Sequence, residues 1–236
     1  MPRISATPSV SSINAAPGGT AAVDRALSVL FAFKAGQGEL TLSELASLTQ
    51  LHKSTVLRLL ASLQHYDLVT RTSTGYRLST GVLRLHAAYS ASSTLEDALM
   101  PILQALVYKT GESAAYHVRQ GDTRLCLFRV DSPHPLRDHI RPGDVLPLTQ
   151  GAGGHVLLAY EDETHPAHEE LLKVGAIVKH GDRVQGLSGI SAPVVNAQGK
   201  LLGAITLTMP TERMKESFIA EVHQAAVEAC RRLGNA

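Results

Sequence analysis

Residues 41–66 read TLSELASLTQLHKSTVLRLLASLQHY and describe two short amphipathic helices joined by a tight turn. Thr41 can cap the first helix while Glu44, three residues later, reaches back to it, as in a capping box. Apolar residues recur at helical spacing in both halves, so each helix has one stripe that can be buried. The pattern predicts a helix-turn-helix with its turn at residues 50–52.

The second helix carries polar and basic side chains on the face opposite its apolar stripe. Ser54 and Arg58 are separated by one helical turn and lie near the start of the helix. An Arg can donate two hydrogen bonds to guanine, and hydroxyl groups bind phosphates or bases. The pattern favours a recognition helix in the major groove of double-stranded DNA. Its candidate DNA-binding residues are Lys53, Ser54, Thr55, Arg58 and Ser62.

A basic hairpin is predicted directly after these helices. Residues 68–71 and 76–78 read as two short strands around a polar turn that ends at Gly75. We expect Arg71 and Arg77 to contact the DNA backbone or a minor groove, as the wing of a winged helix. The same residues also allow the interpretation that this basic face is only solvated. The alternative function is a small-molecule-binding sensor or enzyme whose N-terminal domain mediates protein contacts.

Residues 22–85 resemble the winged helix-turn-helix of the IclR family of bacterial transcriptional regulators, and the resemblance continues to about residue 230. The matching stretches are AVDRAL at 22–27, KSTV at 53–56, RLL at 58–60 and YRL at 76–78. His52, Asp67 and Ser79 depart from the family pattern, which often has Pro, Gly and Gly there. These departures concern the helix ends, and Asp enters a left-handed backbone conformation more readily than most residues.

Length and composition set limits on the class of protein. A chain of 236 residues with 44% hydrophobic residues can form two domains with real cores. No apolar run approaches about 18 residues and no signal peptide is evident at the N-terminus, so we expect a cytoplasmic protein without membrane contact. Cys126 and Cys230 lie in apolar patterns, which suits reduced, buried thiols better than a disulfide.

Charge is distributed unevenly along the chain. Residues 1–90 hold eight Lys and Arg against four Asp and Glu, while the remainder holds 14 against 17. The basic half is therefore the predicted DNA-binding half. A single domain with so little net charge would bind DNA weakly, because phosphate neutralisation supplies much of the affinity. We expect self-association to a dimer, which places two recognition helices about one DNA turn apart, and a tetramer stays open.

The chain is expected to have four parts. Residues 1–21 are rich in Pro, Gly, Ser and Ala and predict a disordered tail. Residues 22–79 form the winged helix-turn-helix, beginning with a helix over residues 22–35. Residues 80–94 form a linker helix, which could also be a third packing helix of the same domain. The resemblance implies that the first helix and the linker helix contribute to the dimer contact. Residues 95–236 form the effector-binding domain.

Hairpins rather than alternating β-α-β units follow in the C-terminal part. The sequence predicts an α+β domain in which helices flank an antiparallel sheet, and the resemblance implies a GAF-like effector-binding domain. The expected helices cover residues 95–110, 151–160, 166–174 and 215–233, and the expected strands cover residues 113–119, 123–131, 137–141, 189–195 and 200–209.

Glycine-rich motifs in this half resemble the family's effector pocket. Gly153 and Gly154 precede or begin a helix, where exposed N–H groups can bind a carboxylate; the other interpretation is that they only form a turn. The departure at His155, where the family usually has Lys, replaces a permanent charge by a group that titrates near neutrality. Lys179 lies in a predicted loop, where some relatives have an acid. The resemblance implies that the ligand-binding residues are Gly153, Gly154, His155, Lys179, Leu187, Gly189 and Ser191.

We therefore expect a small organic acid as effector. Gly189, which lacks a side chain, would enlarge the pocket for acids beyond two or three carbons, including aromatic ones. An enzyme is not expected, because residues 186–190 fail the nucleophile-elbow pattern and residues 151–154 lack the later Gly of a dinucleotide loop. The pair His165 and His168 is typical of a solvated helix start. No catalytic residue, metal or cofactor is predicted, and a regulator of a neighbouring catabolic operon is implied by the resemblance.

Overall fold

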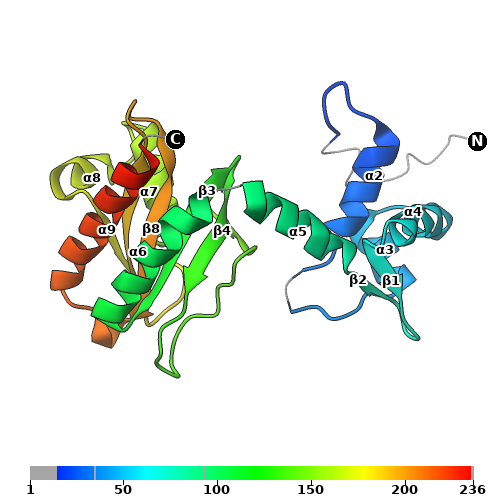
Figure 1. Ribbon diagram of the computed structural model, residues 1–236, viewed down its shortest axis with the longest axis horizontal. Helices are drawn as coiled ribbons and strands as arrows, with labels where there is room; N and C mark the ends of the chain where they lie inside the picture. The colour runs from blue at the N-terminus through cyan, green and yellow to red at the C-terminus, as the bar shows by residue number, and fades with distance from the viewer. Residues whose placement is uncertain (1–14, 35, 93, 235–236) are drawn as a thin grey trace, which may run out of the picture. The chain divides into compact units, whose positions relative to one another are not determined.

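The computed structural model describes residues 15–34, 36–92 and 94–234. The chain divides into two compact units between residues 92 and 93 (Figure 1). Most of the predicted tail, residues 1–14, lies outside the described residues. The last residue of that predicted tail, Ala21, is already the first residue of a helix.

The N-terminal unit is a winged helix-turn-helix followed by one more helix. Its elements are α2 (Ala21–Leu30), α3 (Leu42–Thr49), α4 (Lys53–His65), β1 (Val69–Arg71), β2 (Tyr76–Leu78) and α5 (Gly81–Ser92). The apolar stripes of α3 and α4 supply Leu45, Val56 and Leu60 to a core that Tyr76 of β2 closes. The periodicity therefore predicted both the helices and the side that they bury.

The ends of the two central helices depend on two left-handed residues. Thr41 and Glu44 form the predicted capping box, with the N–H of Glu44 donating to Thr41 Oγ1 at 3.2 Å and the N–H of Thr41 donating to Glu44 Oε2 at 2.7 Å. Gln50 ends α3 with φ 53°, and Asp67 follows α4 with φ 58°. Asp67 thus adopts the conformation for which Gly is the usual residue.

The first helix is shorter than predicted. It was expected to continue to residue 35, but α2 ends at Leu30. Beyond it, the N–H groups of Ala32 and Phe33 bond to carbonyls three residues back, the tighter arrangement that closes many helix ends. In the region of the expected linker helix, residues 80–94, the structure has α5 (Gly81–Ser92), whose Leu83, Leu85 and Tyr89 are exposed.

The C-terminal unit is the predicted α+β domain. Its elements are α6 (Leu95–Thr110), β3 (Ser113–Gln120), β4 (Thr123–Val130), β5 (Val145–Pro147), α7 (Gly151–Glu161), α8 (His168–Val174), β6 (Ile177–His180), β7 (Leu187–Val195), β8 (Leu201–Pro210), the 3-10 turn η1 (Thr211–Arg213) and α9 (Ser217–Leu233). All pairings in its six-stranded sheet are antiparallel, in the order β5-β4-β3-β8-β7-β6.

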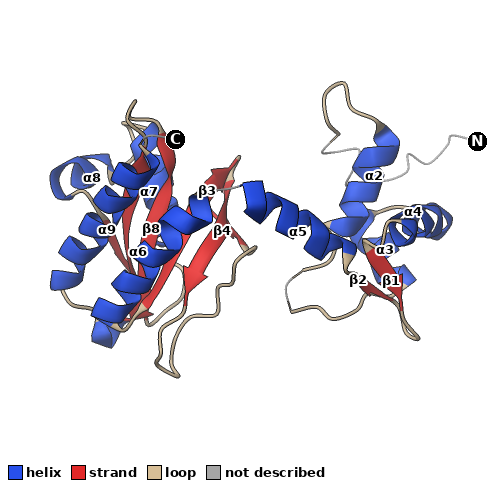
Figure 2. Ribbon diagram, viewed as in Figure 1, coloured by secondary structure: helices blue, strands red, loops and turns tan. Residues whose placement is uncertain are grey.

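Helices cover both faces of this sheet (Figure 2). The helices α6 and α9 pack on one face, where Ile205, Leu207 and Met209 of β8 join the main core. The helix α7 packs on the other face, toward which Ala204 and Thr206 point, with α8 against α7. Because side chains alternate along a strand, β8 contributes apolar residues to the main core on one face of the sheet and lines a partly polar cavity on the other face.

Two sequence predictions in this unit are wrong. Residues 137–141 are a loop, because ion pairs of Asp138 hold this segment instead of a strand ladder, and the edge strand is β5, further along the chain. Lys179 lies in β6, which was expected to be a loop and which pairs with β7. Both edge strands are only three or four residues long, too short for a clear alternating pattern.

The cysteines are free thiols, with Cys126 buried in β4 and Cys230 partly buried in α9. Burial raises the pKa of the Cys126 thiol to about 12, so it stays protonated near neutral pH. Among the helices that the structure describes, none is long and apolar enough to cross a membrane.

Candidate nucleic-acid interface and ligand pocket

The helix α4 has a buried face and an exposed polar face. Lys53, Ser54, Arg58 and Ser62 are exposed, and Thr55 is half-buried. Val56, Leu60 and Leu63 on the opposite face are at most 6% exposed. The predicted recognition residues therefore lie together on the accessible side of one helix, while the core fixes the position of that helix.

The N-terminal end of α4 also favours contact with an anion. Its N-cap, His52, makes no capping hydrogen bond through its side chain, and the first turn contains no acidic residue. The helix dipole leaves partial positive charge at this end, beside the Lys53 ammonium. A DNA phosphate is an anion that such an end binds.

The two wing arginines lie on opposite faces of their hairpin. In the register, Thr70 is opposite Arg77 and Arg71 is opposite Tyr76, and residues that are directly opposite share a face of the pair. Both arginines are exposed. A duplex docked against one face would contact only one of them, so contact by both requires the hairpin tip to enter a groove. Glu39 fixes that tip by accepting hydrogen bonds from Thr72 and Thr74.

A cavity of about 30 Å³ lies between α7, the loop over residues 181–186 and the sheet. Four of the seven residues predicted to bind ligand line it, namely Gly153, Lys179, Leu187 and Gly189. At Gly189 a Cβ would make an ordinary contact of 3.4 Å with the Cβ of Ala152, which also lines the cavity. In this form the cavity accommodates only one or two water-sized groups.

His155 is not among the residues that line the cavity. Its Nε2 lies 3.1 Å from Asp182 Oδ2, and its Nδ1 lies 3.4 Å from Nε2 of His165. Asp182 in turn accepts a hydrogen bond from the N–H of Gly151 at 2.5 Å. An acid of the chain itself therefore occupies the N-terminal end of α7, where the sequence suggested the carboxylate of a ligand. Burial raises the pKa of Asp182, but these hydrogen bonds outweigh it and hold the pKa below its ordinary value.

Gly154 and Ser191 have packing roles beside the cavity rather than in its wall. A Cβ on Gly154 would collide with the carbonyl of Leu148 and with the guanidinium of Arg124. Ser191 is buried, donates to the carbonyl of Ile205 at 2.9 Å and lies 2.9 Å from Thr206 Oγ1. Position 154 requires Gly because the Leu148 carbonyl and the Arg124 guanidinium lie too close for a side chain. Ser191 orients the hydroxyl of Thr206, which lines the cavity.

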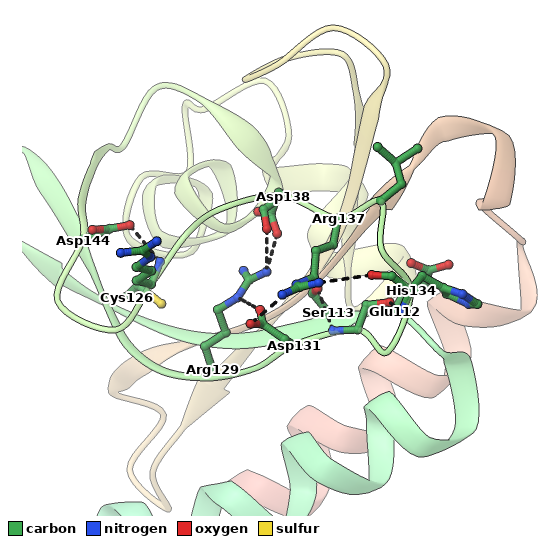
Figure 3. A network of polar contacts seen from close by, with 12 residues as sticks. Glu112, Ser113, Cys126, Arg129, Asp131, His134, Arg137, Asp138 and Asp144 are labelled. Carbon is green, nitrogen blue, oxygen red and sulfur yellow. Dashed lines mark hydrogen bonds and ion pairs between the residues drawn. The ribbon is translucent and has the colours of Figure 1, made fainter. Parts of the chain in front are cut away.

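A buried ion-pair network holds the outer wall of the cavity (Figure 3). Asp138, whose side chain is 2% exposed, pairs with Arg129 of β4 and, at 3.0 Å, with Nη2 of Arg183. Arg183 and Ile140, which lies two residues after Asp138, both line the cavity. The segment after β4 is thereby tied to the loop after β6.

Several polar groups that the strands bring into the cavity were not predicted from the sequence. His117 of β3, Arg124 of β4 and Thr206 and Thr208 of β8 all line it. The signal was weak, because His117 and Arg124 stand in strands that contain further polar residues, such as Arg119 and Arg129. The sequence does not show that these polar groups meet in one cavity, because that depends on the order of the strands in the sheet.

Burial and neighbouring charges change the acidity of both inner groups. Burial, with Arg124, Arg129 and Arg183 nearby, lowers the pKa of His117 to about 3, so its imidazole is neutral. Burial and Arg183 lower the pKa of Arg124 to about 10, which leaves the guanidinium charged at neutral pH. Within the described residues, no cluster of three His, Cys, Asp or Glu side chains is arranged to hold a metal ion.

Two family models match the two units of the chain. The IclR helix-turn-helix domain matches residues 22–73, and the C-terminal domain of the bacterial transcriptional regulator IclR matches residues 87–180. The chain belongs to the IclR family of transcriptional regulators. Members of this family bind DNA through the helix-turn-helix, which here is α3 and α4.

Relatives of known sequence or structure are similar to most of the chain. The HTH-type transcriptional regulator BhcR of Paracoccus denitrificans is 27% identical over 92% of this chain and 87% of its own length. The IclR transcriptional regulator of Alicyclobacillus acidocaldarius has the same fold, with a TM-score of 0.80 at 21% identity over 92% of this chain and 98% of that chain. An IclR homologue of Microbacterium hydrocarbonoxydans, solved in complex with 4-hydroxybenzoate, has a TM-score of 0.80 at 19% identity. The match covers 91% of this chain and 100% of that chain.

Proposed function

We propose that this IclR-family protein regulates a neighbouring catabolic operon in response to a small organic acid, which binds in the cavity of the C-terminal unit. The charge of the cavity wall carries this proposal. Arg124, Lys179 and Arg183 line it together with a single acid, Asp182. An anion binds where such positive charge is enclosed in a low-dielectric wall. The 4-hydroxybenzoate bound to the Microbacterium homologue is a carboxylic acid too.

The size of the cavity favours the smallest acids in its present form. A volume of about 30 Å³ holds a carboxylate-sized group but no aromatic ring. An aromatic acid, which the sequence suggested, requires the loop over residues 181–186 to move outward. Gly181 and Gly186, both at positive φ, bound that loop and supply backbone freedom for such a movement.

The active species in this proposal is a dimer. In the N-terminal unit Phe31 at the end of α2 is 72% exposed, and Leu83 and Leu85 of α5 are 67% and 63% exposed. A second copy that covers these side chains removes them from water and doubles the number of phosphate contacts. The acid controls DNA binding only if it binds two arrangements of the dimer with different affinity.

A gel-shift assay tests the regulator proposal directly. The full chain is mixed with DNA flanking its own gene and with random DNA of equal length, with and without acetate, pyruvate, benzoate and 4-hydroxybenzoate. We expect a sequence-dependent shift whose midpoint one of these acids changes. No preference for the flanking DNA under any condition would contradict the proposal and favour a sensor whose N-terminal domain contacts proteins.

A further inference from the structure

His117 and Arg124 are buried polar side chains whose hydrogen-bonding groups are incompletely used. Each residue is 2% exposed. Arg124 donates through Nη1 to the carbonyls of Pro147 and Gln150, both at 2.5 Å. Within the part of the chain that the structure describes, neither ring nitrogen of His117 nor Nε of Arg124 has a hydrogen-bond partner. Buried polar groups are almost always paired, so these three atoms call for a ligand.

The unpaired atoms converge beside Gly153. A Cβ on that residue would lie 2.7 Å from Thr206 Oγ1, 3.5 Å from His117 Nδ1 and 3.8 Å from Arg124 Nε. Even a Cβ would lie too close to the Thr206 hydroxyl, so the absence of a side chain lets this hydroxyl and the two nitrogen atoms gather against the backbone of residue 153, on the wall of the cavity.

The charge of this position fits an anion. Arg124 forms no ion pair with an acid among the described residues, whereas Arg129 and Arg183 pair with Asp138. A buried guanidinium without a counter-ion is costly, and a carboxylate is the geometric match for its N–H groups. The other end of the site is closed to an incoming acid, because Asp182 already accepts the Gly151 N–H.

We propose that His117 and Arg124 bind the carboxylate of the effector beside Gly153, in the interior of the cavity, and that the N-terminal end of α7 around His155 does not. This inference rests on the proposed function, since it specifies how the acid of that site is recognised. The imidazole N–H of His117 and the Nε–H of Arg124 each donate a hydrogen bond to the carboxylate. Gly153 is required because a Cβ there would collide with the Thr206 hydroxyl and displace the groups that line the site.

Three variants of the full-length protein test the proposal. His117→Leu and Arg124→Met remove the donors, and His155→Gln is the matched control at the neighbouring histidine that faces Asp182. Isothermal calorimetry measures the binding of the four acids used in the gel shift, and the circular dichroism spectrum and melting midpoint without ligand establish that each variant is folded.

We expect the two cavity variants to weaken binding of the acid by at least about tenfold, the loss typical of a hydrogen bond to a charged group, while His155→Gln changes it less than about threefold. Lost binding in His155→Gln with unchanged binding in the cavity variants would overturn the inference and leave acid sensing intact. If the wild-type chain binds none of the acids, the proposed function itself fails, and this inference with it.

A spectroscopic measurement covers the case in which a cavity variant does not fold. In wild-type protein with ¹⁵N-labelled histidine, saturation with the bound acid should shift the ring resonances of His117 strongly. The resonances of His155, assigned from the control variant, should change little. A spectrum in which only His155 responds would place the carboxylate at the helix end and contradict the proposal.

Discussion

Asp138 and Arg183 form an ion pair across 45 residues of sequence, with 3.0 Å between Asp138 Oδ2 and Arg183 Nη2. Asp138 also pairs with Arg129, and the side chains of Asp138 and Arg129 are only 2% and 3% exposed. One carboxylate therefore holds two cations, one on a sheet strand and one on the loop that borders the cavity. Because these charges are buried, they depend on each other far more than surface pairs do.

We expect Asp138→Asn to destabilise the C-terminal unit by about 3–5 kcal/mol, because the variant leaves Arg129 buried without its main counter-ion. Urea unfolding of wild type and variant measures the change. Glu228→Gln is the control, since Glu228 pairs with Arg231 and Arg232 on the exposed surface of α9 and its loss should matter little. Equal stability of the Asp138→Asn variant and the wild type would contradict the structural role of this network.

Different parts of the DNA interface should show different signatures. We expect Arg58→Ala to cost about 1–3 kcal/mol on the specific site and to relax the preference for that site, because Arg58 lies on the exposed face of α4. Fluorescence anisotropy with specific and random duplexes measures both effects. Equal losses on the two duplexes would count against base contact by Arg58.

The wing arginines should have unequal effects. Arg71 and Arg77 lie on opposite faces of the hairpin, so a duplex docked against one face contacts one of them. We expect one of the variants Arg71→Ala and Arg77→Ala to weaken binding to all sequences and to reduce the salt slope by about 1. The other should bind nearly as wild type does, and the same series of salt titrations decides which. Strong, equal effects of both would indicate that the hairpin tip enters a groove.

Protonation of His117 should destabilise the fold at acidic pH. The folded pKa of about 3 lies below the unfolded value of about 6.5. Between these values the unfolded chain binds more protons, so this contribution to stability is present above about pH 6.5 and is lost as the pH falls. From pH 6.5 to 5 it amounts to about 1–2 kcal/mol. Unfolding curves of wild type and His117→Gln over this range should diverge by that amount, and parallel pH dependences would contradict a neutral, buried His117.

The N-terminal unit was predictable because its signals are local. Thr41 and Glu44 are three residues apart, and the stripe of α4 repeats within one helix, so the capping box and the buried face could both be read from the sequence. The cavity depends on strand order instead. His117 and Arg124 meet Gly153 only because the strand order of the sheet brings β3 and β4 to the face that α7 covers. The glycine motifs located the helix but placed the ligand's carboxylate at an end that Asp182 occupies.

Asp67 offers a test of the turn that follows the recognition helix. At φ 58° it has the left-handed conformation, which costs residues with a Cβ up to about 1–2 kcal/mol and Gly almost nothing. We expect Asp67→Gly to raise the free energy of unfolding of the N-terminal unit by up to about 1 kcal/mol. Asp67→Val should lower it, because a β-branched residue tolerates positive φ poorly. Urea unfolding of the wild type and both variants measures their free energies of unfolding. A Val variant as stable as the Gly variant would contradict a left-handed residue at this position.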